Sequence, residues 1–402
     1  MKKVKEGIIC LILSAIMMLS VFPAFADTMS PETDIKNTIT RYFDFQHTIL
    51  SKLDAQGEVI QRIEKVPPFV SNNYLEKFEC VLEMKTLLRK AQPSNTTYDY
   101  YSFDIRFDSI NVADKTASVK LFIVEKIIFN QDRTITSEAG TTHFIELINE
   151  NGQWLINSDK YELDGVGERY DQLKSRLCGD KQCVRDSILT EYAKDVEKSV
   201  IERTKTVEEN PYAANIKQST RTVLSSHTYN PGSTSSPVTY AHTYCRTNNP
   251  SPWYTYTADC TNFTSIAIHQ IIPMDTTGNK WYFNSTSDKT ASWTSAQYFR
   301  QYIYYNNSST TTNSGIYGKH DTYSNCSYGD IVQYASDPDN IWSTDGRPKT
   351  THGSIVTKVS GGYLYVSMHS YGDATSDYRY DYLVDDMDYT AKIYLNIVRY
   401  YD

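Results

Sequence analysis

The sequence predicts an α+β protein built from two successive units, because the spacing of its apolar residues changes along the chain. Apolar residues first recur every four positions, as on one face of a helix, and from about residue 103 they alternate, as along a half-buried strand. A second helix-then-strand order starts near residue 238. In each unit we therefore expect helices followed by antiparallel sheet.

The first 26 residues have the features of an export signal. Lys2, Lys3 and Lys5 precede an apolar run, Ile8 to Phe22, and Ala24-Phe25-Ala26 resembles a signal cleavage site. The run is too short for a stable membrane span. We expect cleavage after Ala26 and a secreted or cell-wall-associated bacterial protein whose mature chain has no transmembrane segment.

The net charge narrows the classes of partner. The full chain carries a formal net charge of -8, and loss of the signal's three lysines and one glutamate makes it about -10. An acidic surface disfavours nucleic acid and anionic membranes as partners. The 33 tyrosines, with many serines, threonines and asparagines, suit a surface that forms hydrogen bonds with glycan or peptide.

The first unit, residues 27–178, begins with helices and continues as sheet. The helical spacings, of three or four residues, lie at Ile35, Ile39 and Phe43 and at Leu75, Phe78 and Leu82. The alternating spacings lie at Phe103, Ile105 and Phe107 and at Val119, Leu121 and Ile123. Ala113-Asp114-Lys115 separates the first two strands, and Asn151-Gly152 is a strong hairpin signal between two more. This architecture resembles the NTF2-like or cystatin-like class. We expect it to act as a spacer or to present substrate, because it holds no convergent acid–base set.

Residues 179–208 are expected to form a connecting helix. Ile188, Tyr192, Val196 and Val200 share one helical face, and charges of both signs occupy the rest, as on a solvated helix. Asn210-Pro211 ends it. Residues 209–402 then form the second unit.

Six cysteines follow the signal: Cys80, Cys178, Cys183, Cys245, Cys260 and Cys326. Cys178 and Cys183 bracket a short loop that a disulfide could close, and Cys245 with Cys326 is a possible second pair. The spacings do not resemble a zinc site, and we expect no metal and no organic cofactor.

One cysteine stands at the start of a predicted helix. In Tyr256-Thr257-Ala258-Asp259-Cys260-Thr261-Asn262-Phe263, Asp259 fits the N-cap position and Cys260 the first turn. The helix dipole there favours a thiolate. His352 opens a predicted strand downstream, and a cysteine on a helix N-terminus with a histidine on a strand is the arrangement of papain-like cysteine hydrolases.

The second unit carries four motifs in a recognisable order. They are Asp259-Cys260-Thr261-Asn262-Phe263, Gly329-Asp330-Ile331-Val332-Gln333-Tyr334, His352-Gly353-Ser354-Ile355-Val356-Thr357 and Val366-Ser367-Met368-His369-Ser370. In this order they resemble the putative amidase domain family of secreted bacterial proteins, over roughly residues 210–402. That family is similar to the NlpC/P60 and CHAP peptidoglycan hydrolases. The resemblance implies a papain-like, NlpC/P60-type domain, with the helix of the site packed on an antiparallel sheet.

The residues also suggest individual roles. Cys260 would be the nucleophile and His352 the general base. His369 would orient the imidazole, because the hairpin from Val356 to Val366 returns it beside His352, and Asp373 is the alternative. The backbone N–H of Cys260 and a group from the loop 254–256 would form the oxyanion hole. We expect Asp259 to act as a helix cap and Asn262 as a hydrogen-bond partner in the helix turn.

These expectations combine into one activity with two alternatives. The chain would be a cysteine amidase or peptidase that cleaves a C–N amide bond through a thioester on Cys260. The resemblance and the export signal imply peptidoglycan stem peptides, or related cell-surface amides, as substrates. A catalytically silent cell-surface binding module of the same fold and a general cysteine peptidase are the alternatives. The sequence does not indicate an oligomeric state.

Overall fold

The computed structural model describes residues 30–51, 69–92, 97–178, 185–204, 226–228, 236–276, 280–305, 315–343, 346–370 and 377–401. The predicted signal peptide and Asp373 lie outside these residues. Mixed helix and antiparallel sheet confirm the α+β class. None of the helices in the described ranges is both long and apolar enough to cross a membrane.

The first unit has the predicted order of helices, strands and hairpins. Helices α2 (Pro31–Ser51) and α4 (Asn72–Ala91) precede strands β1 (Tyr98–Ala113), β2 (Thr116–Phe129), β3 (Thr136–Glu150) and β4 (Gln153–Lys160). The predicted turns are present: Asp114, Asn151 and Gly152 have positive φ angles of 50°, 54° and 84°. Asn and Gly tolerate this left-handed conformation best, which explains the hairpin at Asn151-Gly152.

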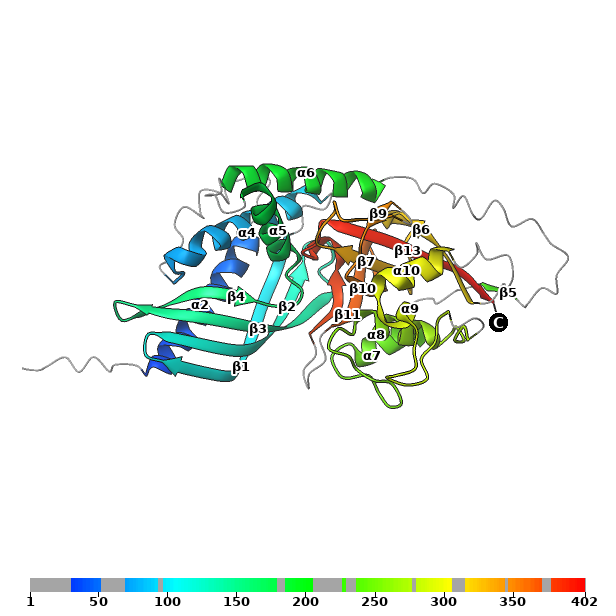
Figure 1. Ribbon diagram of the computed structural model, residues 1–402, viewed down its shortest axis with the longest axis horizontal. Coiled ribbons are helices and arrows are strands. Elements are labelled where there is room, and N and C mark those ends of the chain that lie inside the picture. Colours follow the sequence, from blue (N-terminus) through cyan, green and yellow to red (C-terminus); the bar gives the residue numbers. More distant parts are fainter. Residues whose placement is uncertain are drawn as a thin grey trace, which may run out of the picture.

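Two further helices follow the sheet of the first unit. They are α5 (Gly165–Cys178) and α6 (Arg185–Thr204), which lies along the upper edge of Figure 1 over α4 and α5. Ile188, Tyr192 and Val196 are buried against α4 and α5, as the spacing predicted. The charged face of α6 was expected to be solvated. Near its end, however, Arg203 is largely buried and forms an ion pair with the fully buried Asp385 of the second unit.

The second unit places its helices before most of its strands. The helices are α7 (Ser236–Tyr244), α8 (Cys260–His269), α9 (Ala291–Thr294) and α10 (Ala296–Tyr305), and the short β5 (Ser226–Thr228) precedes them. The strands are β6 (Gly315–Asp321), β7 (Ile331–Ala335), β8 (Ile341–Trp342), β9 (Arg347–Pro348), β10 (His352–Ser360), β11 (Tyr363–His369), β12 (Tyr378–Leu383) and β13 (Ala391–Tyr401). Short 3₁₀ turns, η3 (Tyr323–Asn325) and η4 (Val384–Asp386), complete the fold.

One sheet runs through both units. Its order is β1-β2-β3-β12-β11-β10-β7-β13-β5, with β4 on β3 and β6 on β13. The units join where β12 pairs with β3, in the register Tyr378↔Gly140, Arg379↔Ala139 and Tyr380↔Glu138. Gly140 is required at this junction, because an added Cβ would lie 2.3 Å from the ring of Tyr378.

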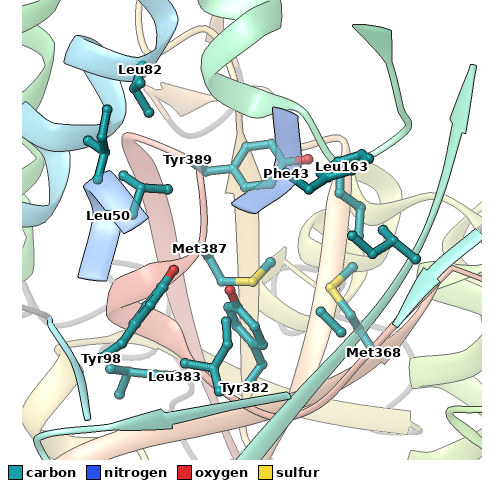
Figure 2. Close-up of a cluster of buried hydrophobic side chains, with 14 of the residues drawn as sticks. Phe43, Leu50, Leu82, Tyr98, Leu163, Met368, Tyr382, Leu383, Met387 and Tyr389 are labelled. Atoms are coloured by element: carbon teal, nitrogen blue, oxygen red, sulfur yellow. The ribbon is translucent and has the colours of Figure 1, made fainter. Parts of the chain in front are cut away.

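One hydrophobic core, like the sheet, contains residues of both units. Figure 2 shows Phe43 and Leu50 of α2, Leu82 of α4 and Tyr98 of β1 around Met368, Tyr382, Leu383, Met387 and Tyr389 of the second unit. A second core lies on the other face of the β7 and β10 region, against α7, α8 and α10. On β10, Val356 belongs to the first core and Ile355 to the second, as expected from alternation along a strand.

Candidate active site

Cys260 is the first residue of α8, at the position the sequence predicted. Its side chain is 5 % exposed. Sγ lies 3.8 Å from the carbonyl oxygen of Thr351 and interacts with the backbone N–H of Gly353. These are the residues on either side of His352, so α8 holds the thiol against the start of β10.

Burial disfavours the thiolate of Cys260 in this position. Burial raises the pKa of Cys260 above its ordinary value, although the N–H of Gly353 and the hydroxyl of Thr261 act in the opposite direction. Burial thus outweighs the expected stabilisation of a thiolate by the helix N-terminus. A nucleophilic role therefore needs a base that removes the proton.

Asp259 does not cap the helix with its side chain, which corrects the expectation from sequence. Its fully buried carboxylate instead accepts four hydrogen bonds. Oδ1 accepts from the backbone N–H of Tyr256 (2.7 Å) and from Nδ2 of Asn262 (2.9 Å), and Oδ2 accepts from Nδ2 of Asn249 (2.8 Å) and from Nδ1 of His369 (2.8 Å). This carboxylate fixes the loop before the helix and the end of β11 together.

His369 ends β11 as predicted, but its ring bonds Asp259 and not His352. Both partners in the His369–Asp259 pair are fully buried. Nδ1 faces the carboxylate of Asp259, and the other ring nitrogen, Nε2, has no hydrogen-bond partner. Asp259 was missed as a partner because an aspartate before a helix is usually a cap.

His352 opens β10 as predicted and is 8 % exposed. In the antiparallel pairing of β10 with β7, His352 lies opposite Tyr334. The centroid of its ring is 5.7 Å from that of Tyr389, which belongs to the first core. Within the described residues no hydrogen bond joins His352 to Cys260 or to His369. The structure thus brings Cys260 beside the backbone of His352, and His369 beside Asp259, without a closed chain of hydrogen bonds.

Burial lowers the pKa of His352 to about 4, and the charge of Arg379 adds to the shift. The imidazole is therefore neutral at neutral pH, as a general base must be. In the unfolded chain the histidine pKa is about 6.5, so the unfolded state takes up the proton first as pH falls.

This difference predicts acid sensitivity. Stability from His352 is complete above about pH 6.5 and is lost as pH falls toward 4, at up to about 1.4 kcal/mol per pH unit. Urea unfolding at pH 7 and pH 5, followed by tryptophan fluorescence, should show a smaller loss for His352→Gln than for the parent chain. An equal loss in both proteins would contradict the assignment.

The predicted oxyanion hole is only partly available. The backbone N–H of Tyr256 donates to Asp259, and the carbonyl of Tyr254 accepts from Asn249 and Asn262. Neither group is free to bind substrate. The backbone N–H of Cys260, in the first turn of α8, is not used within the helix. The buried hydroxyl of Tyr256 has no hydrogen-bond partner, so it is a second donor left from the expected set.

The other predicted residues have structural roles. Asn262 accepts from Nε1 of Trp293 (2.8 Å) and donates to Tyr254 and Asp259. Asp330 precedes β7 as expected, but it is buried, and burial raises its pKa to about 7. Among the described residues there is no group of three or more His, Cys, Asp or Glu side chains that could hold a metal.

The cysteines correct one disulfide expectation. Cys245 and Cys326 are both free and buried, so the proposed pair between them is wrong. They lie in different hydrophobic cores, Cys245 with α7 and α8 and Cys326 with η3. Cys178 is in a disulfide, and Cys183, its predicted partner, lies outside the described residues.

Comparison with known proteins gives one match to a family. Residues 232–396 match the model of the "putative amidase domain" family, which suggests an amide hydrolase and includes Cys260, His352 and His369. No curated protein matches the chain. The structure of the intermembrane space region of the chloroplast protein ARC6 is similar over 33 % of this chain and 96 % of that one, with 16 % identity and a TM-score of 0.25. A likeness this small carries no argument about fold or function.

Proposed function

We propose that residues 232–396 form a cysteine hydrolase of amide bonds, with Cys260 as nucleophile. The observation that carries this proposal is the position of Sγ at the first residue of α8, against the backbone on both sides of His352. A nucleophile and a base must come within hydrogen-bond reach, and His352 is the titratable residue that stands between the two backbone groups on Sγ.

The chemistry follows from these groups. The neutral imidazole of His352 takes the thiol proton, and the thiolate attacks the amide carbonyl. The C–N bond breaks, the amine leaves with the proton from His352, and a thioester remains on Cys260. Water, deprotonated by the same imidazole, then hydrolyses the thioester and restores the thiol. The backbone N–H of Cys260 would donate to the developing oxyanion.

His369 serves as a positioning residue in this proposal. Its bond to Asp259 holds β11 against the residue that precedes Cys260. Its Nε2 has no hydrogen-bond partner and is left as the unused atom of the ring. This replaces the direct contact with His352 that the sequence suggested.

The proposed substrate is the peptidoglycan stem peptide or a related cell-surface amide, met after export. The family resemblance and the export signal in residues 1–26 support this, and no residue of the site specifies it. A silent binding module is the second candidate. It is favoured by the burial of Cys260 and His369 and by the absence of a hydrogen bond among Cys260, His352 and His369 in the described structure.

Product analysis tests the proposal. The chain from Asp27 should release fragments with new amino groups from purified peptidoglycan, identified by mass spectrometry. His352→Ala should slow release by roughly 10²- to 10⁴-fold, the usual contribution of a general base, and His369→Ala should slow it less. His242→Ala is the matched control: it removes a histidine that bonds Asp381 of β12 and none of the three candidate site residues, and it should release fragments normally.

No release by the parent chain would favour the binding module. Unchanged release by His352→Ala would remove His352 as the base.

A further inference from the structure

A cavity lies between the two units, against the core that they share. Its volume is about 80 Å³, whereas one water needs roughly 10–15 Å³, so the cavity has room for several waters or one small organic molecule. The apolar part of its wall consists of Phe43, Leu50, Ile127, Leu163 and Met387, and Figure 2 shows all of these but Ile127. Both units therefore contribute to one wall.

The polar part of the wall contains four carboxylates, and each of them has a partner. The pairs are Glu125–His47 (2.8 Å), Asp159–His143 (2.8 Å), Asp386–Arg89 (2.8 Å) and Asp388–Lys85 (2.6 Å). Hydroxyl groups of tyrosines add a bond to two of the acids, because Tyr42 donates to Asp159 (3.1 Å) and Tyr382 to Asp386 (2.6 Å). The acids are thus already engaged, each with a basic side chain of its own.

Arg379 of β12 is the remaining cation of the wall, and it has no such partner. It is 8 % exposed, and among the described residues no carboxylate oxygen lies within 4.0 Å of its nitrogens. Glu125 and Asp377 are close enough only to interact with its charge at longer range. The ring of Tyr382, with its centroid 5.3 Å from Cζ, compensates the charge in part. A buried charge without a counter-ion is costly, so the position favours an anion.

The hydrogen bonds of Arg379 leave one edge of its guanidinium unused. Nη1 donates to the hydroxyl of Thr141 (3.1 Å) and to the carbonyl of Tyr378 (2.9 Å). Nε and Nη2 donate to no described residue, and both keep accessible surface, whereas the unused Nε of Arg89 has none. Two adjacent N–H groups of a guanidinium bind both oxygens of one carboxylate or phosphate in parallel hydrogen bonds. The open edge therefore indicates a ligand with two oxygens on one atom.

The rest of the wall favours a carboxylate over a phosphate. A phosphate carries oxygens on every side, and those turned away from Arg379 would meet apolar side chains or the carboxylates of Glu125 and Asp386. A carboxylate continues instead into an aliphatic part, which the five apolar side chains can cover. The volume of about 80 Å³ limits that part to a few carbons and excludes a peptide.

We propose that this cavity binds a small aliphatic carboxylate, held in two parallel hydrogen bonds by Nε and Nη2 of Arg379. The ligand is a free short-chain acid of about the size of propionate. The inference does not rest on the proposed function, because it involves neither Cys260 nor hydrolysis. It gives the first unit a part in ligand binding in place of a spacer role. Since both units line the cavity, the bound acid should also stabilise their junction.

Calorimetric titration of the chain from Asp27 with sodium propionate tests the proposal. Propionamide, which has a similar shape without the charge, is the matched probe, and sodium chloride keeps the ionic strength constant. Propionate should bind, and propionamide should not. Arg379→Gln should weaken the binding of propionate roughly 10- to 100-fold, because a charged pair of hydrogen bonds is lost.

Arg106→Gln is the control for this substitution. Arg106 also lies over an aromatic ring, that of Phe122 (5.1 Å), but it does not line the cavity, so binding should be unchanged. Circular dichroism shows whether Arg379→Gln is folded. If it is not, Arg379→Lys decides, because lysine keeps the charge without the two adjacent N–H groups and should bind propionate about tenfold more weakly.

Equal binding of the two probes, no binding of either, or unchanged binding of propionate by the folded Arg379 variant would overturn the proposal. Inorganic phosphate that binds more tightly than propionate would overturn it as well. None of these measurements uses turnover, so their outcome is distinct from that of the tests on Cys260.

Discussion

Replacing Cys260 with alanine is expected to lower amide hydrolysis by roughly 10³-fold or more, because removal of a nucleophile leaves only binding and oxyanion stabilisation. Cys260 is buried at the start of α8 with Sγ against Thr351 and Gly353. The initial rate of fragment release from peptidoglycan, compared at equal protein concentration, measures the effect.

Cys245→Ala is the matched control for this substitution. Cys245 is also free and fully buried, and it packs in the core next to α8. It should cost some stability through a small cavity, about 1 kcal/mol, with little change in turnover. Equal loss of activity in both variants would show that packing, and not the thiol, is what hydrolysis requires.

Replacing Arg89 with methionine is expected to destabilise the protein by about 3–5 kcal/mol at pH 7. Arg89 of α4 pairs with Asp386 of η4 (2.8 Å), and both side chains are almost wholly buried. Removing the guanidinium leaves a buried carboxylate without its counter-charge. Chemical unfolding followed by circular dichroism measures the loss.

The same variant should respond to pH in a defined direction. Burial raises the pKa of Asp386 to about 6, with Arg89 opposing the shift. Below that pH the carboxyl takes up a proton and needs no counter-charge, so the loss from Arg89→Met should be smaller at pH 5 than at pH 7.

Arg106→Met is the control for this pair. Arg106 and Asp108 form an exposed pair, with side chains 52 % and 26 % exposed, and exposed pairs contribute roughly 0–1 kcal/mol. A similar loss of unfolding free energy in Arg89→Met and Arg106→Met would show that the buried Arg89–Asp386 pair stabilises the protein no more than an exposed pair does.

The parts of the fold that the sequence predicted depend on local patterns. The helix at Cys260, the strand at His352, the hairpin at Asn151-Gly152 and the hairpin from Val356 to Val366 follow from spacing and from residues that favour positive φ. Such signals lie within a few residues of the elements that they specify. The positions of Cys260, His352 and His369 on their elements were predictable for this reason.

The features that the sequence did not predict join residues far apart in the chain. Neither the pairing of β12 with β3 nor the bond between Asp259 and His369, 110 residues apart, has a local signal. The Arg89–Asp386 pair is of the same kind. The shared sheet and core therefore had to be seen in the structure, and they explain why both units line the cavity beside Arg379.

Trapping the acyl-enzyme tests the central claim most directly. The chain from Asp27 is mixed with a peptide amide that it cleaves, quenched in acid within the first turnover, and digested for mass spectrometry. The account predicts an adduct with the mass of the substrate acyl group on the peptide that contains Cys260, lost in Cys260→Ala and present in Cys245→Ala. Hydrolysis that continues in Cys260→Ala, or an acyl adduct on another residue, would contradict it.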